Sequence, residues 1–516
     1  MQHLHRLHMA MAALSSLAFV FSLLVLSHLA NRIDTLNGTE LTVAHQPDTL
    51  RVITRDSPAT YYATTTGSNA DEANASGFEH ALLQAFAEHI GKKLEIETAS
   101  TLAEIYSALE EQRVHIAAPG LPIERQRQAR FTVTKPYAKH QQEVVYRVGN
   151  KRPRQVSDLA GRDIVVVADS SQASQLAALQ GDNPGIQWRE VSKSDYIDLL
   201  HPIESGEADY AIIGVNEFRL HRGFFPRVKE GFRLGEPESI AWALPAAFAN
   251  TPLHNAANQF LQTIATDGRL AKLEERFFGH SEHVSQMAAN EFDKNYERHL
   301  PRHRQMIGEV AEKFDMEWQL LAAISYQESG WNERAKSPTG VRGLMMLTLP
   351  TAREVGVTNR LDPAQSLHGG ALYLQRIKSR LADDIQEPDR SWLALAAYNV
   401  GMGHLQDART LTRRRGGDPN AWYDIKQDLP LLSKPEWYRT TRYGYARGHE
   451  PVTYVQNIRH YFNVLQLKDR YRQRSVGEYE APISISTANE QSTPLETTTL
   501  ANTEALEPAL GAVRSL

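Results

Sequence analysis

The feature that most constrains the fold of this chain is a change of hydrophobic pattern near residue 301. Before it, short apolar runs typical of β-strands alternate with stretches at helical spacing. The strand-like runs are 50–54, 94–97, 114–118, 143–147, 163–167 and 208–213, and the helical stretches are 78–90, 102–111 and 194–200. After it, strand signals nearly vanish and helical patterns continue to about residue 474. The chain therefore predicts an α/β domain of parallel strands and crossover helices, followed by a mainly α domain.

These patterns, within 516 residues, divide the chain into several segments. Residues 31–48 are polar and without period, which indicates a linker. The α/β domain is expected over 49–280, a polar, partly helical connector over 281–300, and the helical domain over 301–474, with Pro301 marking a break. Residues 475–516 are rich in Ser, Thr, Glu, Ala and Pro and cannot bury a core, so a disordered tail is expected there.

The first thirty residues have the pattern of a signal peptide or a single membrane anchor. Arg6 precedes an uncharged, mostly apolar run from Met9 to Leu29. Ala30 is a suitable last residue before cleavage, whereas His28 stands where a small residue is preferred. Cleavage and retention both stay open, and either one indicates export from the cytoplasm.

Charge and cysteine content limit the chemistry. The chain has no cysteine, which excludes disulfides, thiolate metal sites and a cysteine nucleophile. Net charge is −5, yet residues 302–474 carry 26 Lys and Arg against 19 Asp and Glu. A basic helical domain suits a polyanion, either nucleic acid or an anionic cell-wall polymer, and the leader favours the second. The histidines show no ligand spacing, so neither a metal nor a cofactor is expected.

Four sequence blocks in the amino-terminal half occur in a recognisable order. They are Gly77-Phe78-Glu79, then residues 120–125, Lys135-Pro136-Tyr137 and residues 206–211. With them the segment resembles the type II periplasmic solute-binding family, in its polar amino-acid branch. The resemblance implies a two-lobed α/β domain that closes around a ligand by a hinge motion.

The same resemblance suggests an effector site. Arg125 matches the arginine that grips a ligand α-carboxylate, for which a planar guanidinium offers two parallel donors. Ser170 and Ser171 match positions that often contact the ligand. Gly214 stands where the family places the acid that receives the α-amino group. The implied effector is a cell-wall peptide or another amino-acid-like molecule with a free carboxylate, and a spacer that binds nothing is the alternative.

Glu328 is the candidate catalytic residue of the helical half. Leu320, Leu321 and Ile324 form one helical face, Glu328 continues it, and Gly330 follows where a helix should end. A carboxyl against apolar surface loses hydration when it ionises, so its pKa should rise. A raised pKa is what a general acid needs near neutral pH.

Four motifs surround this residue in sequence order. They are Glu328-Ser329, residues 343–346 (Gly-Leu-Met-Met), residues 396–399 (Ala-Ala-Tyr-Asn) and Tyr454-Val455. With them, residues 306–465 resemble the lysozyme-like transglycosylase family. That resemblance implies non-hydrolytic cleavage of the MurNAc-GlcNAc β-1,4 bond of peptidoglycan. In that chemistry one glutamate protonates the glycosidic oxygen, then accepts the proton of the sugar's own 6-hydroxyl, which leaves a 1,6-anhydromuramoyl end.

The resemblance also implies substrate contacts, at Ser329, Met345, Met346, Tyr398, Asn399 and Tyr454. Both tyrosines are expected near the catalytic carboxyl, with packing roles as the alternative. The Met345 thioether is expected in the cleft wall, and Met346 replaces the family's usual glutamine.

Two other acids, Glu333 and Glu450, are the nearest rivals for catalysis and are expected to be solvated. Trp331 and Trp437 are expected to pack in the core. The alternative function is a non-catalytic periplasmic receptor for solutes or muropeptides. Family resemblance places the protein on the periplasmic side, peripheral on the outer membrane.

Overall fold

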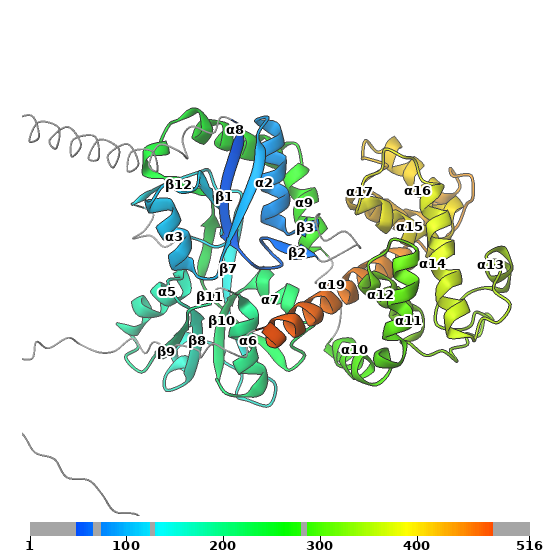
Figure 1. Cartoon of the computed structure of the whole chain (residues 1–516), viewed down its shortest axis with the longest axis horizontal. Coiled ribbons are helices and arrows are strands. Elements are labelled where there is room, and N and C mark those ends of the chain that lie inside the picture. Colours follow the sequence, from blue (N-terminus) through cyan, green and yellow to red (C-terminus); the bar gives the residue numbers. More distant parts are fainter. Residues whose placement is uncertain (1–47, 65–73, 124–128, 194, 280–285, 478–516) are drawn as a thin grey trace, which may run out of the picture.

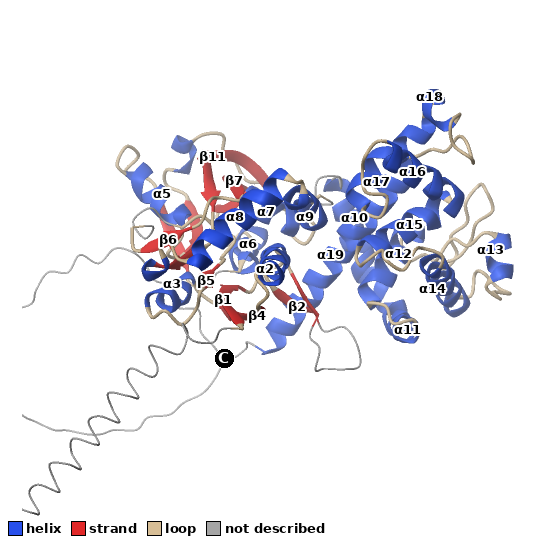
Figure 2. Ribbon diagram, turned by 90° about the horizontal axis from the view of Figure 1, so that it is seen from above, coloured by secondary structure: helices blue, strands red, loops and turns tan. Residues whose placement is uncertain are grey.

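The computed structural model describes residues 48–64, 74–123, 129–193, 195–279 and 286–477. The leader predicted over 1–30, most of the 31–48 linker, nearly all of the predicted tail, and Arg125 lie outside the described residues. Strands occupy one half of the molecule, and the other half is built from helices (Figure 2). Within the described ranges, no helix is long and apolar enough to cross a membrane.

The first lobe of the amino-terminal half is built on a five-stranded sheet of order β4-β1-β5-β12-β6. Its strands are β1 (Thr49–Arg55), β4 (Lys93–Ala99), β5 (Ile116–Ala117), β6 (Phe131–Val133) and β12 (Ala243–Pro245). Its helices are α2 (Phe78–His89), α3 (Leu102–Glu110), α8 (Pro252–Thr266) and α9 (Arg269–Phe278). The predicted apolar face of α2 is buried, with the Phe86 ring 5.3 Å from that of Trp242. A small sheet of β2 (Tyr62–Thr64) and β3 (Asn74–Ser76) contacts α2.

The second lobe contains the other five-stranded sheet, of order β11-β7-β10-β8-β9. Its strands are β7 (Ala138–Arg147), β8 (Asp163–Val167), β9 (Gln187–Val191), β10 (Tyr210–Gly214) and β11 (Val228–Ile240). Its helices are α5 (Ser171–Gln180), α6 (Tyr196–Ser205) and α7 (Val215–His221). The strand predicted over 163–167 coincides with β8, whose last four residues are buried.

The expectation of parallel strands is only partly correct, because both sheets are mixed. Strands β4 and β5 run parallel to β1, and β9 and β10 run parallel to β8. In contrast, β7 is antiparallel to β10 and β11, and β12 is antiparallel to β5 and β6. The reason is the two-lobed design: Ala138 on the strand that leaves the first lobe pairs with Ile240 on the strand that returns. Outgoing and returning segments run in opposite directions, so they pair as antiparallel strands.

The helical half holds one continuous apolar core. Its helices are α10 (Gln286–Arg298), α11 (Leu300–Lys313), α12 (Trp318–Ser329), α13 (Leu349–Glu354), α14 (Pro363–Ser379), α15 (Asp389–Val400), α16 (Met402–Arg414), α17 (Trp422–Asp428), α18 (Pro435–Tyr438) and α19 (His449–Gly477). The central helix α12 packs against α11 and α19. This arrangement buries its apolar face and leaves its carboxyl end near the start of α19.

One sequence expectation at the junction needs correction. The segment expected to be a connector contains α10, which packs into the helical core. Phe292 of α10 is 1% exposed, and its ring stacks on Tyr461 at 5.0 Å. Pro301 lies in the first turn of α11, where its missing N–H has no helical partner to lose, and a break between helices falls just before it, from the end of α10 at Arg298 to the start of α11 at Leu300.

Helix α19 joins the two halves (Figure 1). Near its start Tyr454 lies in the core of the helical half. Further along, the Asn463 side-chain amide donates to the Leu220 carbonyl of the second lobe at 3.1 Å. Still further, the Tyr471 ring lies 5.5 Å from that of Phe224. One helix therefore contacts both the candidate active site and the solute-binding-like lobes.

Candidate active site and ligand cleft

Glu328 lies in the last turn of α12, as the helical pattern predicts. On the same helix Leu321 and Ile324 are fully buried, and Glu328 itself is only partly exposed. Gly330 ends the helix with φ of 60°, a left-handed conformation that glycine adopts without the cost of a Cβ. The helix therefore delivers one carboxyl to the edge of an apolar core.

Tyr454 is the direct partner of this carboxyl. Its hydroxyl donates to Oε1 of Glu328 at 2.5 Å. Burial raises the pKa of Glu328 to about 7, although the hydrogen bond from Tyr454 acts in the opposite direction by stabilising the carboxylate. The acid and its conjugate base are therefore both populated near neutral pH, as a group that first gives and then takes a proton requires.

Tyr398 is a second phenol beside the same acid. Its ring stacks on that of Tyr454, with centroids 6.5 Å apart and planes 10° apart. Its hydroxyl donates to the Met345 carbonyl at 3.2 Å. Burial and the neighbouring Glu328 charge raise the pKa of both phenols well above their usual value. Both tyrosines therefore stay protonated and act as hydrogen-bond donors, not as bases.

The Gly343–Met346 turn is fastened to the end of α12. The Ser329 hydroxyl donates to the Leu344 carbonyl at 2.9 Å and to the Ser325 carbonyl at 3.0 Å. Gly343 has φ of 83°, and a Cβ there would lie 1.8 Å from the Arg360 carbonyl oxygen. Ser329 thus joins the first two motifs, and the glycine of the second motif is required by a close backbone approach.

The two methionines of this turn have opposite surroundings. Met345 is 1% exposed and packs against Gly370, so its thioether does not form the cleft wall, contrary to expectation. The Met345 side chain lies in the core because the turn directs it inward. Only its backbone carbonyl contacts Tyr398. Met346 is partly exposed with φ of 45°, so it is the residue of this turn that faces outward.

The remaining predicted positions fall as follows. Asn399 is exposed near the end of α15. Glu333 and Glu450 form ion pairs with neighbouring arginines, and their side chains are 44% and 58% exposed, as expected of solvated residues. Trp331 is buried, with its indole N–H bonded to the Ala322 carbonyl, and Trp437 is partly buried against the core.

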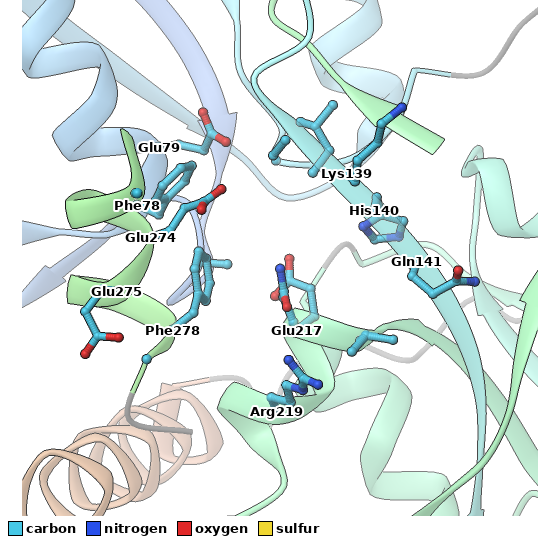
Figure 3. A pocket seen from close by; sticks show the side chains of 18 of the residues that line it. Phe78, Glu79, Lys139, His140, Gln141, Glu217, Arg219, Glu274, Glu275 and Phe278 are labelled. Carbon is cyan, nitrogen blue, oxygen red and sulfur yellow. The ribbon is translucent and has the colours of Figure 1, made fainter. Parts of the chain in front are cut away.

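A second site lies between the two lobes of the amino-terminal half (Figure 3). It is a cavity of about 550 Å³ whose lining includes Glu79, His140 and Glu217. Tyr423 and Lys426 of α17 also line it, so the helical half contributes to its wall. The cavity is in position to take a small polar ligand that contacts both halves of the molecule.

Two of the blocks singled out in the sequence meet at this cavity. Tyr137 donates to Oε1 of Glu79 at 2.6 Å, and the Trp242 indole donates to Oε2 at 3.2 Å. Burial raises the pKa of Glu79 to about 7, against the two hydrogen bonds and the charge of Arg55. Glu79 is therefore an internal carboxyl held by two aromatic donors.

A buried ion pair spans the lobes and was not anticipated from the sequence. Arg55, at the end of β1, contacts Oε1 of Glu217 on α7 at 2.7 Å, and both side chains are buried. These residues lie 162 positions apart, and neither belongs to a recognised motif. Only the pairing of the two lobes brings them together, so no local signal reveals them.

The His140 ring explains why a glycine, and not an acidic residue, stands at position 214. A Cβ at this position would lie 2.3 Å from Cε1 of His140, so the imidazole occupies the space of the missing acidic side chain. Burial lowers the pKa of His140 to about 4, which keeps it neutral. Ser170 caps α5 by accepting from the Ala173 N–H, and Ser171 accepts from the Gln142 amide. Both serines are buried with partners inside the lobe.

Comparisons with known proteins match both halves. Residues 50–280 match the model for bacterial extracellular solute-binding proteins, family 3, and residues 305–420 match the transglycosylase SLT domain. A membrane-bound lytic murein transglycosylase F from Hahella chejuensis is 43% identical over 83% of this chain and 83% of its own length. Proteins of the same name from Pseudomonas putida and Saccharophagus degradans are 44% and 40% identical over 81% and 89% of this chain, and over 84% and 90% of their own lengths.

The chain belongs to the membrane-bound lytic murein transglycosylase F family. Membership accounts for the order of its halves, with the solute-binding-like half first and the transglycosylase half second. Among solved structures, an ancestral arginine-binding protein bound to arginine is 22% identical, with a TM-score of 0.39, over 45% of this chain and 100% of that one.

Proposed function

We propose that this protein is a peptidoglycan lytic transglycosylase with Glu328 as its single acid and base. The observation that carries the proposal is the pair of Glu328 and Tyr454, which unites the first and last of four ordered motifs. Membership of the lytic murein transglycosylase F family supports the same activity.

The geometry supports a two-step reaction in one site. Protonated Glu328 gives its proton to the glycosidic oxygen, and the bond from that oxygen to C1 of the muramoyl sugar breaks. The sugar's 2-acetamido oxygen stabilises the positive charge at C1. The Glu328 carboxylate then takes the proton of the 6-hydroxyl while O6 bonds to C1. The acid is regenerated, no water is consumed, and the product has a 1,6-anhydro end.

The surroundings of Glu328 favour this route over a two-carboxylate glycosidase mechanism. The two sequence rivals, Glu333 and Glu450, are solvated and paired with arginines. Tyr454 holds one carboxylate oxygen, which fixes the carboxyl and leaves the other oxygen for substrate. Asn399 and Met346 are the proposed substrate contacts beside the tyrosines, with Ser329 in a supporting position.

The proposal is tested by digesting purified peptidoglycan with the parent protein, Glu328→Gln and Glu333→Gln. Mass spectrometry of the products should find anhydromuramoyl ends with the parent and with Glu333→Gln. Glu328→Gln should be inactive with an unchanged melting temperature at pH 5. Reducing ends from the parent would contradict the transglycosylase mechanism, and tight muropeptide binding without turnover would favour the receptor alternative.

We also propose that the amino-terminal half, with boundaries near 49 and 280, senses an amino-acid-like or peptide effector. The cavity wall shared with α17 supports this role, as does Glu275, which lines the cavity and contacts Arg459 of α19 at 3.0 Å. An effector that moved Glu275 would act on the helix that carries Tyr454. Stem peptides cut from the same peptidoglycan should bind and change the cleavage rate. Binding without any change in rate would contradict the sensing role.

The leader and the family name support a location on the periplasmic side of the envelope, peripheral on the outer membrane, with peptidoglycan and not nucleic acid as partner. Fractionation of cells that express the full chain tests this. The protein should sediment with outer membranes and be released by treatments that leave integral proteins in place.

A further inference from the structure

The loop between α18 and α19 exposes two aromatic side chains. Tyr443 is 52% exposed and Tyr445 is 57% exposed. In the described part of the chain six large hydrophobic side chains are exposed, and two of them are these tyrosines. A tyrosine ring offers a ligand both an apolar face and a polar edge, so this loop is a candidate binding surface.

The loop is held in place by a buried acid. Asp407 of α16 is 4% exposed, and its two carboxylate oxygens accept the backbone N–H groups of Arg442 and Tyr443 at 3.0 and 2.8 Å. Burying a carboxylate is costly unless its oxygens are bonded, and here both are bonded to this loop. Asp407 therefore fixes the backbone from which the Tyr443 side chain projects.

The Tyr443 ring is supported on its inner side. A Cβ at Gly403 would lie 2.8 Å from Cδ1 of Tyr443, so the ring rests against the bare backbone of Gly403. The His404 ring lies 6.3 Å from the Tyr443 ring, and the Arg442 guanidinium lies 5.5 Å from it. A supported ring with half of its surface exposed is ready to bind without first losing much conformational freedom.

The backbone that supports this ring is only a few residues from the candidate active site. Gly403 is at the start of α16, four residues after Asn399 and five after Tyr398. Tyr398 stacks on Tyr454, and Tyr454 bonds Glu328. Contacts therefore link the acid to Tyr454 and Tyr398, and the short α15–α16 turn connects Tyr398 to Gly403, on which the Tyr443 ring rests.

We propose that Tyr443 is a stacking subsite for a pyranose ring of the glycan strand, beyond the sugars that flank the cleaved bond. An aromatic ring matches the C–H face of a pyranose, so stacking of the ring itself is the contact. Asp407 is the positioning residue for this subsite. The inference rests on the proposed function, because its ligand is the strand that Glu328 cleaves.

The test compares Tyr443→Ala with Tyr443→Phe on long glycan strands and on a peptidoglycan tetrasaccharide. Tyr443→Ala should raise KM for long strands about threefold to tenfold, the loss expected for one aromatic stacking contact, and leave kcat unchanged. Tyr443→Phe should keep the parent KM, and the tetrasaccharide should not distinguish the variants. Met287→Ala removes an exposed apolar side chain of α10 and serves as the control.

Unchanged KM on long strands for Tyr443→Ala, with an active parent, would overturn this inference alone. An equal loss on the tetrasaccharide would also overturn it, because the effect would then not depend on strand length. If the parent yields no anhydro ends, the proposed function itself fails. Asp407→Asn should raise the same KM, and a lower kcat on the tetrasaccharide instead would contradict its positioning role.

Discussion

Glu328 combines two opposed influences on one carboxyl. Burial against the helical core favours the protonated acid, and the hydrogen bond from Tyr454 favours the carboxylate. The balance leaves its pKa at about 7. This value is a compromise, because the first step requires the protonated acid and the second step requires the carboxylate. At the scale of a residue, activity therefore depends on one hydrogen bond as much as on the acid itself.

Tyr454→Phe removes that hydrogen bond and tests this balance. Because the bond stabilises the carboxylate, its loss should raise the pKa of Glu328 further. The acid must be protonated in the free enzyme, so kcat/KM should fall as pH rises through about 7 in the parent, and at a higher pH in the variant. Lost stabilisation of the charged form should also lower kcat about tenfold.

The matched control is Tyr461→Phe, also on α19, which removes a phenol oxygen from a buried ring. Its pH profile should match that of the parent. A Tyr454→Phe profile that moved to lower pH would contradict the role assigned to the hydrogen bond.

The sequence predicted where a side chain lies, or what role it has, only where a helical period or an ordered set of motifs included the residue. Helical spacing correctly indicated that Glu328 lies on the buried face of its helix. It could not separate Met345 from Met346, because their turn contains positive φ angles and has no period. The Arg55–Glu217 ion pair was not predicted for a different reason, because only the packing of the two lobes brings these residues together.

At the scale of an element, the Gly343–Met346 turn positions the backbone carbonyls that hold Tyr398 and Ser329 beside the catalytic acid. It presents the Met345 carbonyl to Tyr398 and receives the Ser329 hydroxyl at the Leu344 carbonyl. Only a glycine at 343 allows the turn to approach the Arg360 carbonyl. The strands and helices named from the sequence of the first half correspond to elements of the structure, whereas β9, β11, α8 and α9 were not named. The mixed direction of the sheets was not predicted either, because direction depends on the path between lobes.

Two glycines three residues apart provide a matched test of this turn. Gly340 and Gly343 both have positive φ, 87° and 83°, but a Cβ at Gly340 meets nothing within 4 Å. Gly340→Ala should lower the free energy of unfolding by about 1 kcal/mol, from backbone strain alone. Gly343→Ala should cost several times more, and should also abolish cleavage because the turn must move. Thermal melting and peptidoglycan digestion measure both effects, and equal losses would contradict the role of the close approach.

At the scale of the whole molecule, Glu275 links the two halves. Its carboxylate contacts Arg459 of α19 at 3.0 Å and Lys426 of α17 at 2.5 Å. The Arg459 side chain is only 2% exposed, and its guanidinium also donates to two backbone carbonyls of the first lobe. Because a buried cation is shared in this way, we expect the two halves to unfold together.

Glu275→Ala should separate them, because it leaves the Arg459 charge buried without its carboxylate. We expect a loss of about 3 kcal/mol and two thermal transitions in place of one. Lys272→Ala, which removes a more exposed ion pair with Asp424 at the same interface, should change little. One unaltered transition in Glu275→Ala would show that the link does not depend on this residue.

The central claim is that one carboxyl cleaves the glycan without water, and digestion in water enriched in heavy oxygen tests it most directly. If the 6-hydroxyl of the sugar attacks C1 with Glu328 as acid and base, mass spectrometry of the new ends should find anhydro sugars that contain no heavy oxygen. Reducing ends that carry one heavy oxygen for each cleaved bond would contradict the account.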